Sequence, residues 1–303
     1  MSKVHWLALS TISGIGGATA RKLLDSLGDV EAIFDAPDDQ LMAIPRVTPE
    51  VVARLRSVSL DALEAELASL DDEGFQALTW EDDGYPENLR LLNDAPPVLF
   101  VRGELLLEDA QAVAIVGTRQ ATPRGAAIAE RLAGELAQHG LTVVSGLALG
   151  IDTAAHRGAL TAEEGRTLAV LGSGLRHIHP RENRSLAAAI ESRGALLSEL
   201  HPNTPPRGVN LMARDRIISG LSRAVIVVEA QEKSGSLDTA AKAKRQGRLV
   251  FAVPGSPGTE SLLAKGAERL QPDAANFDSL LQQIRTHPQG RNSNAAQLGL
   301  WGA

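Results

Sequence analysis

The sequence contains no cysteine and few aromatic residues. Among its 303 residues are three Trp, one Tyr and five Phe. Without cysteine the chain can form neither disulfides nor thiolate metal sites, which fits a reducing compartment such as the cytoplasm. After Phe100 the aromatic residues are Phe251, Phe277 and Trp301. Stacking on aromatic rings therefore cannot be the main way in which the second half of the chain binds a ligand.

Long hydrophobic runs and targeting segments are also missing. No stretch of about 18 apolar residues occurs, so we expect no membrane span. The N-terminus, MSKVHWLALSTISGIGG, lacks a charged start followed by a small-residue cleavage site, so we expect no secretory signal. With 44% hydrophobic residues the chain can bury a sizeable core, in one large domain or two smaller ones. These features predict a cytoplasmic protein.

Acidic residues predominate overall, but they are unevenly distributed. The formal net charge is −7. Residues 1–110 contain 8 Lys/Arg and 21 Asp/Glu, a balance of −13, whereas residues 166–248 contain 14 and 7, a balance of +7. Charges act over about 8 Å at physiological salt, so a polyanion responds to the nearest surface and not to the total. The basic segment favours a polyanionic partner, although a solvated surface with chance clustering would give the same counts.

Short helical patterns fill the first 75 residues and predict a small helical domain. They span Val4–Leu9, Ala18–Leu27, Val30–Phe34, Asp38–Ile44 and Pro49–Leu70.

The glycines between the first two helical patterns are typical of a helix-hairpin-helix motif. Gly14, Gly16 and Gly17 allow a tight turn between the helices. Residues 41–47 resemble a degenerate second copy, with Arg46 where the hairpin glycine is expected. Such hairpins can offer backbone N–H groups to a DNA phosphate, but the acidic surroundings here favour structural packing. The residues expected to hold the first hairpin together are Ile12, Ile15, Ala20 and Leu24.

From residue 111 onward, apolar strands alternate with helical patterns, after an extended segment at Val98–Val101. The expected strands are Val113–Val116, Thr142–Ser145, Thr167–Leu171, Ala195–Ser198, Ala224–Val228 and Leu249–Val253. The expected helices are Pro123–His139, Asp152–Leu160, Arg181–Ser192, Leu237–Gln246 and Glu260–Lys265. Short apolar strands joined by crossovers predict an α/β fold with a doubly wound, mostly parallel sheet.

These patterns predict that the chain divides into three segments. We expect the helical domain over residues 1–75 and the α/β domain over residues 80–285. The remaining residues, 286–303, are polar and rich in Asn, Gln and Gly, which predicts a disordered tail.

The ends of the expected strands carry residue types that bind phosphate. The segments VAIVGTR (113–119) and VVSGLALGID (143–152) run from a β-branched strand through glycine and a hydroxyl residue into a helical pattern. Such a loop leaves backbone N–H groups free at a helix N-terminus, and Arg119 adds a guanidinium that can form paired hydrogen bonds with phosphate. Each loop alone is also explained as a helix-starting turn. Together they favour a shared anionic ligand, because parallel strands end at one edge of the sheet.

Fingerprints of nucleotide enzymes are missing from these loops. Gly117 is followed by Thr-Arg-Gln-Ala and not by G-x-G-x-x-G, so no nicotinamide or flavin cofactor is expected. There is neither a Walker A lysine motif nor a set of residues with zinc-ligand spacing. Ser145 and Ser173 stand in glycine turns without a nucleophile elbow, and Asp152 is expected to cap a helix. We predict no catalytic residue, no cofactor and no metal.

Several long segments resemble the DNA-processing protein A family (DprA or Smf). The resemblance covers about residues 80–285, in order, and the N-terminal helices resemble the small helical domain often found in this family. The matching segments are GTRQATPRG (117–125), SGLALGIDTAAHRGAL (145–160), LGSGLRHIHPRENRSL (171–186), ARDRIISGLSRAVIVVEA (213–230), KSGSLDTAAKAKRQGR (233–248) and VFAVPG (250–255).

This resemblance implies an extended Rossmann fold in a homodimer that binds single-stranded DNA without consuming nucleotide. In natural transformation (competence), such a protein protects incoming strands and passes them to the RecA recombinase. By residue match, the DNA-binding residues would be Gly117, Thr118, Arg119, Ser145, Gly146, Arg181, Asn183, Arg184, Arg214, Lys233, Ser234 and Gly235.

The chain departs from the family pattern in places. Thr118 stands where the family often has Ser, which keeps the hydroxyl. Leu211 and Met212 stand where the family commonly has an aromatic residue and proline, so base stacking is not expected there. Asp215 replaces an asparagine and removes a hydrogen-bond donor. Many relatives continue into a winged-helix-like domain, which we do not expect in this sequence.

Two other functions remain open. Residues 254–260 loosely resemble a loop of nucleoside-monophosphate phosphoribohydrolases, but the partner motif upstream is absent. A mononucleotide or second-messenger sensor could use the same pocket. A strand binder, unlike either alternative, should gain affinity with oligonucleotide length. Its contacts should be mainly to backbone phosphates, with weak sequence preference and a steep dependence on salt.

Overall fold

A computed structural model of the protein describes residues 3–271 and 277–288. The described chain divides into two compact units. Unit 1 contains residues 3–85 and 90–100, and unit 2 contains residues 86–89 and most of the chain from residue 101 onward. From residue 289 onward, the expected tail lies outside the described residues. Within the described ranges, no helix is both long and apolar enough to cross a membrane.

Unit 1 is built from short helices followed by strand β1 (Phe75–Thr79). The expected helix Pro49–Leu70 is wrong as a single element. Ser59 has extended backbone, and its side chain accepts a hydrogen bond from the Ala62 N–H (3.3 Å), which starts a new helix. The helices are α1 (Lys3–Thr11), α2 (Gly17–Leu27), α3 (Val30–Asp35), α4 (Asp38–Met42), α5 (Pro49–Ser57) and α6 (Leu60–Asp72).

Both helical hairpins of unit 1 turn through left-handed backbone. Gly14 has a φ of 104°, and Arg46, in the second hairpin, has a φ of 79° where a glycine was expected. A Cβ atom on Gly17 would lie 2.0 Å from the carbonyl oxygen of Ala95, so this glycine allows the start of α2 to pack directly against the backbone at Ala95. Of the residues expected to hold the first hairpin together, Ile12, Ile15 and Ala20 are buried, whereas Leu24 is only half-buried and its neighbour Leu23 is the buried leucine. The turn at Gly14 and the close packing at Gly17 therefore explain these two glycines without a DNA contact.

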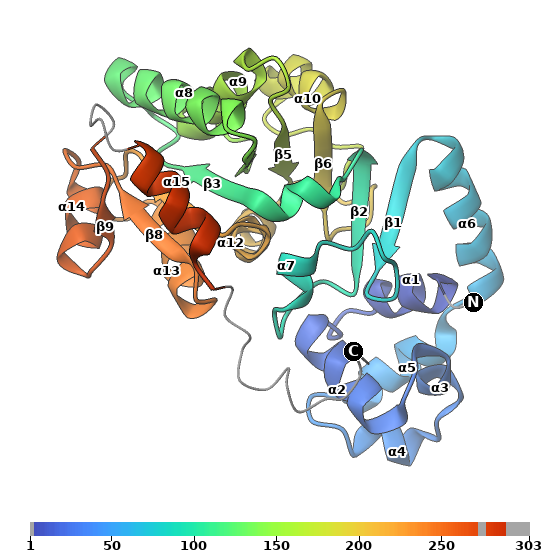
Figure 1. The fold of residues 1–303 in the computed structure, drawn as a ribbon. Helices are drawn as coiled ribbons and strands as arrows, with labels where there is room; N and C mark the ends of the chain where they lie inside the picture. The colour runs from blue at the N-terminus through green and yellow to red at the C-terminus, as the bar shows by residue number, and fades with distance from the viewer. Residues whose placement is uncertain (1–2, 272–276, 289–303) are drawn as a thin grey trace. The chain divides into compact units, whose positions relative to one another are not determined.

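Unit 2 is an α/β fold, and the six strands expected from residue 111 onward are confirmed. In space the strands of this unit follow the order β6-β5-β4-β3-β7-β8-β9, and neighbouring strands are parallel (Figure 1). The strands are β3 (Ala112–Val116), β4 (Thr142–Ser145), β5 (Thr167–Val170), β6 (Gly194–Ser198), β7 (Ala224–Val227), β8 (Leu249–Ala252) and β9 (Glu268–Arg269). Strand β2 (Val98–Gly103) precedes them in the chain.

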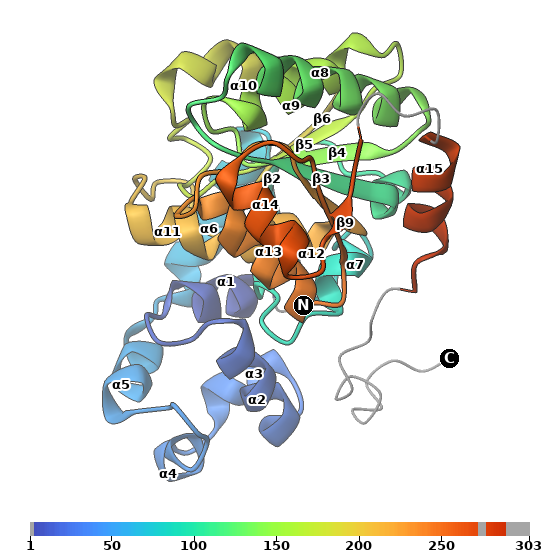
Figure 2. The ribbon, with the colours of Figure 1, turned by 90° about the vertical axis from the view of Figure 1, so that its left-hand side faces the viewer.

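Helices cover both faces of this sheet. Figure 2 shows α8, α9 and α10 above the sheet and α12, α13 and α14 below it. The helices are α7 (Glu87–Arg90), α8 (Pro123–Gln138), α9 (Ile151–Thr161), α10 (Arg184–Glu191), α11 (Gly208–Ala213), α12 (Asp215–Leu221), α13 (Gly235–Arg245), α14 (Pro257–Ala264) and α15 (Phe277–Thr286), with short 3₁₀ turns at Leu107–Gln111 and Arg181–Asn183.

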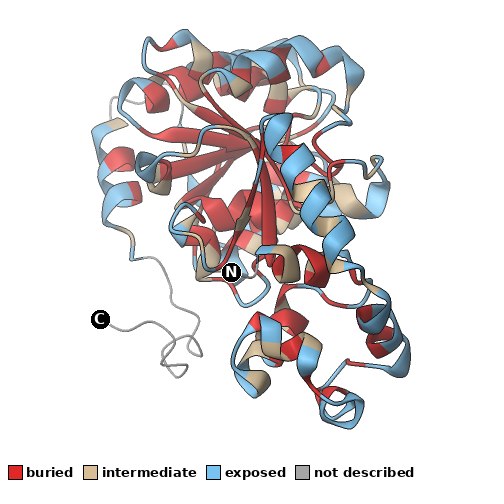
Figure 3. Cartoon of the chain, turned by 90° about the vertical axis from the view of Figure 1, so that its right-hand side faces the viewer, coloured by how far each residue is buried: buried red, intermediate tan, exposed pale blue. Residues whose placement is uncertain are grey.

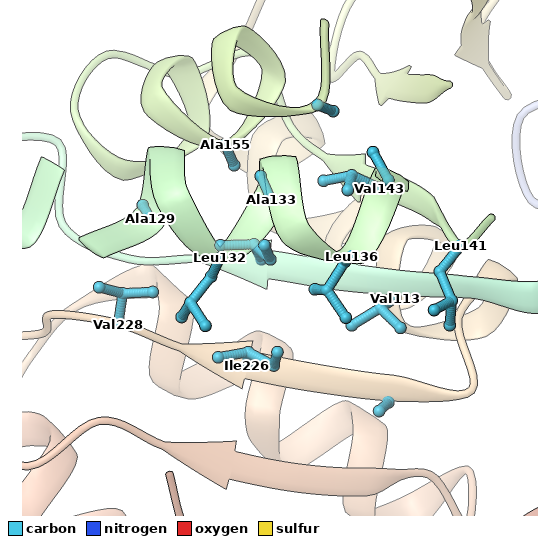
Figure 4. Packing of buried hydrophobic residues seen from close by; sticks show 14 of the residues in the cluster. Val113, Ala129, Leu132, Ala133, Leu136, Leu141, Val143, Ala155, Ile226 and Val228 are labelled. Carbon is cyan, nitrogen blue, oxygen red and sulfur yellow. The ribbon is translucent and has the colours of Figure 1, made fainter. Parts of the chain in front are cut away.

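The core of unit 2 lies between the sheet and its helices. Leu132 and Leu136 of α8 pack over Val113 of β3 and Ile226 of β7, and all four side chains are buried (Figure 4). Strands β3 to β7 are buried along their whole length, while the outer faces of the helices are exposed (Figure 3). Burial on both faces explains why these strands are continuous apolar runs and do not alternate.

The winding of the chain creates a switch point between β3 and β7. From β3 the chain moves outward through β4, β5 and β6, then returns to place β7 on the other side of β3. Loops that leave the carboxyl ends of β3 and β7 therefore diverge to opposite faces of the sheet and leave a crevice between them. In doubly wound sheets, ligands bind in this crevice.

Candidate nucleic-acid interface

A cavity of about 640 Å³ occupies the switch point. Its walls come from the end of β3 and the loop that follows, residues 116–120, and from the segment that enters α13, residues 231 and 233–236. Seven of the twelve predicted DNA-binding residues line this cavity, namely Gly117, Thr118, Arg119, Arg214, Lys233, Ser234 and Gly235.

Two cations of the cavity have free head groups. Arg119 and Lys233 are exposed. Across the described residues, neither side chain has a hydrogen bond or an ion pair within the protein. An unpaired guanidinium and an unpaired ammonium on the walls of one cavity favour an anionic ligand.

The N-terminus of α13 faces the same cavity. Ser234 is the N-cap residue of this helix, but its side chain makes no capping hydrogen bond, and its Oγ lies 2.8 Å from the Oγ of Ser236. In the first turn of α13 the Leu237 N–H donates to the Ser234 carbonyl (3.1 Å), whereas helical geometry leaves the N–H groups of Gly235 and Ser236 without a partner in the helix. The helix dipole is positive at this end. The cavity therefore combines a helix N-terminus, two hydroxyls and two free cations, which is a suitable set of donors for phosphate.

Arg214 also lines the cavity, but its guanidinium is buried and bonded within the protein. Nη1 donates to the Val170 carbonyl (2.6 Å), Nε donates to the Leu211 carbonyl (3.1 Å), and Nε lies 2.9 Å from Oδ1 of Asp215. A Cβ atom on Gly146 would lie 1.7 Å from Nη1, so this glycine makes room for the guanidinium. Arg214 thus joins the end of β5 to α11 and α12. That Arg214 and Gly146 contact DNA directly stays a prediction.

Two buried carboxylates, Asp152 and Asp215, line the cavity together with Arg214. Asp152 accepts hydrogen bonds from the N–H groups of Gly146 (3.1 Å) and Ala148 (3.4 Å). It lies inside α9, whose N-cap is Gly150, so the expected capping role of Asp152 is wrong. Burial raises the pKa of Asp152, although the charge of Arg214 acts in the opposite direction. Burial raises the pKa of Asp215 to about 6 against the attraction of Arg214 and Lys242.

The other predicted residues lie around the cavity and do not line it. Ser145 is buried and its Oγ donates to the Ile115 carbonyl (2.7 Å). Asn183 is buried and its Nδ2 donates to the Leu147 carbonyl and to Thr153 Oγ1, both at 2.8 Å, which fixes the loop after β4. Arg181 and Arg184 flank Asn183 and are exposed. Two exposed arginines around the start of α10 thus flank Asn183, which is bonded to the loop that reaches the cavity through Ala148.

Sequence patterns did not predict α11, which contributes Gly208, Leu211 and Met212 to the cavity. This six-residue helix buries none of its side chains, and Val209 and Met212 are 74% and 58% exposed. Leu149, next to Ala148, is 42% exposed. A helix this short shows no hydrophobic periodicity in the sequence. The apolar pair Leu211 and Met212, close before Arg214, was the signal that could have pointed to this part of the cavity.

Comparison with known proteins follows the same division of the chain. The model of the DNA recombination-mediator protein A family matches residues 76–285. A second model, of the SAM-like helix-hairpin-helix tandem, matches residues 7–58, in agreement with the two hairpins of unit 1. The DNA processing protein DprA of Bacillus subtilis is 41% identical over 221 residues, which cover 71% of this chain and 74% of that protein.

Solved structures agree with this assignment. The X-ray structure of DNA processing protein A from Streptococcus pneumoniae matches with a TM-score of 0.74 and 34% identity, covering 88% of this chain and 94% of that chain. A structure of DNA processing protein A from Helicobacter pylori, described as giving insights into its unique single-stranded DNA binding mode, matches with a TM-score of 0.62 and 34% identity, covering 69% of this chain and 96% of that chain. The resemblance to the DprA/Smf proteins is confirmed, and the chain belongs to the DNA recombination-mediator protein A family.

Proposed function

We propose that the protein binds single-stranded DNA through the cavity at the carboxyl ends of β3 and β7. The observation that carries this proposal is the pair of free cations, Arg119 and Lys233, in one cavity with the uncapped N-terminus of α13. Donors of this kind position the sugar–phosphate backbone of a nucleic acid. The relative from H. pylori, whose described property is a single-stranded DNA binding mode, supports this choice of polyanion.

Bases would contact apolar side chains in place of aromatic rings. Met212 lines the cavity, and Val209 and Leu149 are exposed beside it. Their side chains offer surface to the face of any base and no base-specific hydrogen bond. We therefore expect little preference among sequences. Unpaired strands should be preferred over duplexes, because paired bases cannot reach this surface.

In the cell, the protein would act in the cytoplasm during natural transformation. We propose that it protects incoming single strands as a homodimer and delivers them to the RecA recombinase. Membership of a recombination-mediator family supports this role. Binding would involve no cofactor and no chemical step, so the protein would not be an enzyme.

Fluorescence anisotropy with oligothymidylates of increasing length tests the binding function. We expect affinity to rise with length, and the single strand to bind more tightly than the duplex of the same length. Thymidine monophosphate that binds as tightly as the longest strand, or a preference for duplex, would contradict the proposal. Incubation with AMP should release no free base, and release would support the phosphoribohydrolase alternative.

The recombinase role has its own experiment. On single strands already coated with a single-stranded-DNA-binding protein, addition of this protein should accelerate strand-dependent ATP hydrolysis by RecA. Sedimentation in the same buffer should give the mass of a dimer. An unchanged RecA rate with a protein that binds the strand would remove the loading role and leave the binding function in place.

A further inference from the structure

Two helix N-termini meet at the switch point, and their donors are used differently. One belongs to α8, which follows β3, and the other to α13, which follows β7. At α13 no side chain caps the helix. At α8 the N-terminus already holds an anion, which is the carboxylate of Glu229.

The Glu229 carboxylate binds Thr122, the N-cap residue of α8. Its Oε2 accepts hydrogen bonds from the backbone N–H of Thr122 (3.0 Å) and from the Thr122 hydroxyl (2.9 Å). The Thr122 Oγ1 in turn accepts from the Gly125 N–H (3.0 Å). A Cβ atom on Gly125 would lie 2.0 Å from Oε2, so glycine at this position makes room for the carboxylate.

Glu229 also engages the loop before α8 through its backbone. Its carbonyl oxygen accepts from the Thr118 N–H (2.7 Å), and a Cβ atom on Gly117 would lie 2.7 Å from that oxygen. Pro123, the first residue of α8, has no N–H to offer. The N–H groups of Thr118, Thr122 and Gly125 are therefore committed within the protein.

This position has a specific meaning in a doubly wound sheet. The pyrophosphate of a bound nucleotide usually lies at the N-terminus of the helix that follows the first strand of the unit. A carboxylate there carries the same sign of charge as phosphate and uses the same hydrogen bonds. Over the described part of the chain, Glu229 has no cationic partner within ion-pair distance, so its carboxylate is stabilised by Thr122 at the positive end of α8.

We propose that Glu229 is a specificity-determining residue whose carboxylate takes the place of a phosphate at α8 and so excludes free nucleotides and pyrophosphate from the switch point. This inference goes beyond the proposed function, because it concerns the ligands that the fold rejects. It is independent of whether the cavity beside α13 binds DNA.

Titration calorimetry of the full chain with inorganic pyrophosphate tests the proposal. Glu229→Ala should bind pyrophosphate at least tenfold more tightly than the original protein, because it frees the Thr122 N–H and removes the competing charge. Glu229→Gln should show a smaller gain, of threefold or more, because the charge is lost while an acceptor remains. Glu232→Gln removes the same charge from the exposed part of the same loop and should stay within twofold of the original protein.

The site of binding can be read from backbone amides. In ¹⁵N-labelled Glu229→Ala, the resonances of Thr122 and Gly125 should shift on addition of pyrophosphate. Folded Glu229 variants that bind no more tightly than the original protein would overturn the proposal. An equal gain in Glu232→Gln, or shifts confined to residues 234–236, would also overturn it. If Glu229→Ala does not fold, as judged by circular dichroism, the same outcomes apply to the near-isosteric Glu229→Gln.

Failure of this proposal is distinguishable from failure of the proposed function. The oligothymidylate titration of the original protein reports on the cavity beside α13 and uses no Glu229 variant. A protein that binds no oligonucleotide, but gains pyrophosphate binding in Glu229→Ala, would contradict only the proposed function.

Discussion

Three cationic side chains, Arg119, Arg214 and Lys233, line the same cavity, but their surroundings give them different roles. Arg119 and Lys233 are exposed, and within the described chain they are bonded to no other protein group. Arg214 is 5% exposed and uses its donors on two carbonyls and a carboxylate. A buried guanidinium whose Nε and Nη1 are bonded within the protein stabilises the fold around it, whereas an exposed one gains new hydrogen bonds when a phosphate arrives.

Replacement of Arg119 should therefore weaken DNA binding without weakening the fold. We expect Arg119→Ala to lose about 1.5–3 kcal/mol of binding free energy to an oligothymidylate, roughly ten- to hundredfold in affinity, the range for hydrogen bonds to charged groups. Arg157→Ala, which removes an exposed arginine of α9 outside the cavity, is the matched control. Affinities would come from anisotropy and midpoints of unfolding from circular dichroism. If both variants bind alike, the phosphate site lies elsewhere.

Asp215 should make stability depend on pH in the acidic range. Burial raises its pKa from 3.8 to about 6 in the folded protein. The folded state therefore holds this proton more tightly than the unfolded state, so the contribution to stability is full below pH 4 and is lost as the pH rises through 6. The free energy lost is about 3 kcal/mol, from 1.36 kcal/mol per pKa unit.

Urea unfolding of the original protein and of Asp215→Asn between pH 4 and 7 measures this contribution. Because other titrating groups are common to both proteins, the difference in their unfolding free energies isolates Asp215. That difference should shift in favour of Asp215→Asn by about 2–3 kcal/mol between pH 4 and pH 7. A difference that does not change with pH would show that Asp215 titrates normally.

At the scale of elements, α8 and α9 pack together through glycines. A Cβ atom on Gly158 of α9 would lie 2.0 Å from the carbonyl oxygen of Glu130 in α8, and one on Gly134 of α8 would lie 3.2 Å from the carbonyl oxygen of Gly158. The helices thus approach each other by backbone contact, which brings Leu132 and Ala155 together into the core. This close approach places the loops before both helices beside the cavity.

Gly158→Ala should destabilise the protein through this contact. The clash is with backbone, which cannot rotate away, so we expect a loss of about 1–3 kcal/mol in the free energy of unfolding, typical of overpacking. Gly208→Ala is the control, because its Cβ would meet nothing within 4 Å and its φ is not positive. Thermal unfolding distinguishes the two variants. Equal midpoints would mean that the helices separate at little cost.

At the scale of the whole molecule, charge is divided along the chain. The first 110 residues carry a balance of −13, and residues 166–248 carry +7. The basic segment contains Arg181, Arg184 and Lys233, while Arg119 joins it at the switch point. Because fields at protein surfaces are screened beyond about 8 Å at physiological salt, the net charge of −7 does not prevent binding of a polyanion.

Salt dependence should report how many of these cations meet phosphates. Four contacts, from Arg119, Arg181, Arg184 and Lys233, predict a slope of about −3 for the logarithm of affinity against the logarithm of salt concentration, at about −0.7 per phosphate. Arg119→Ala should reduce the slope by about 0.7. Anisotropy titrations at several KCl concentrations give these slopes. A slope near zero would exclude binding through backbone phosphates.

The sequence alone determined the strands of unit 2 and the loops that end them. Runs such as Val113–Val116 are uniformly apolar and β-branched and stop at glycine, which are local properties that any parallel strand requires. The same local signals identified Arg119 and the two hairpins of unit 1, and the family resemblance added Lys233. They could not separate Pro49–Leu70 into α5 and α6, because the break depends on a single capping serine.

Only the tertiary structure decided which predicted donors are free and which are committed. Arg214 finds the carbonyl of Val170, 44 residues away, and Glu229 finds Thr122, 107 residues away. In sequence, Arg119 and Arg214 look equally suited to phosphate. Burial costs a charged group its hydration unless partners replace it, and those partners come from distant loops that meet only when the sheet forms. The free cations, the internal anion at α8 and the exposed helix α11 are therefore properties of the fold.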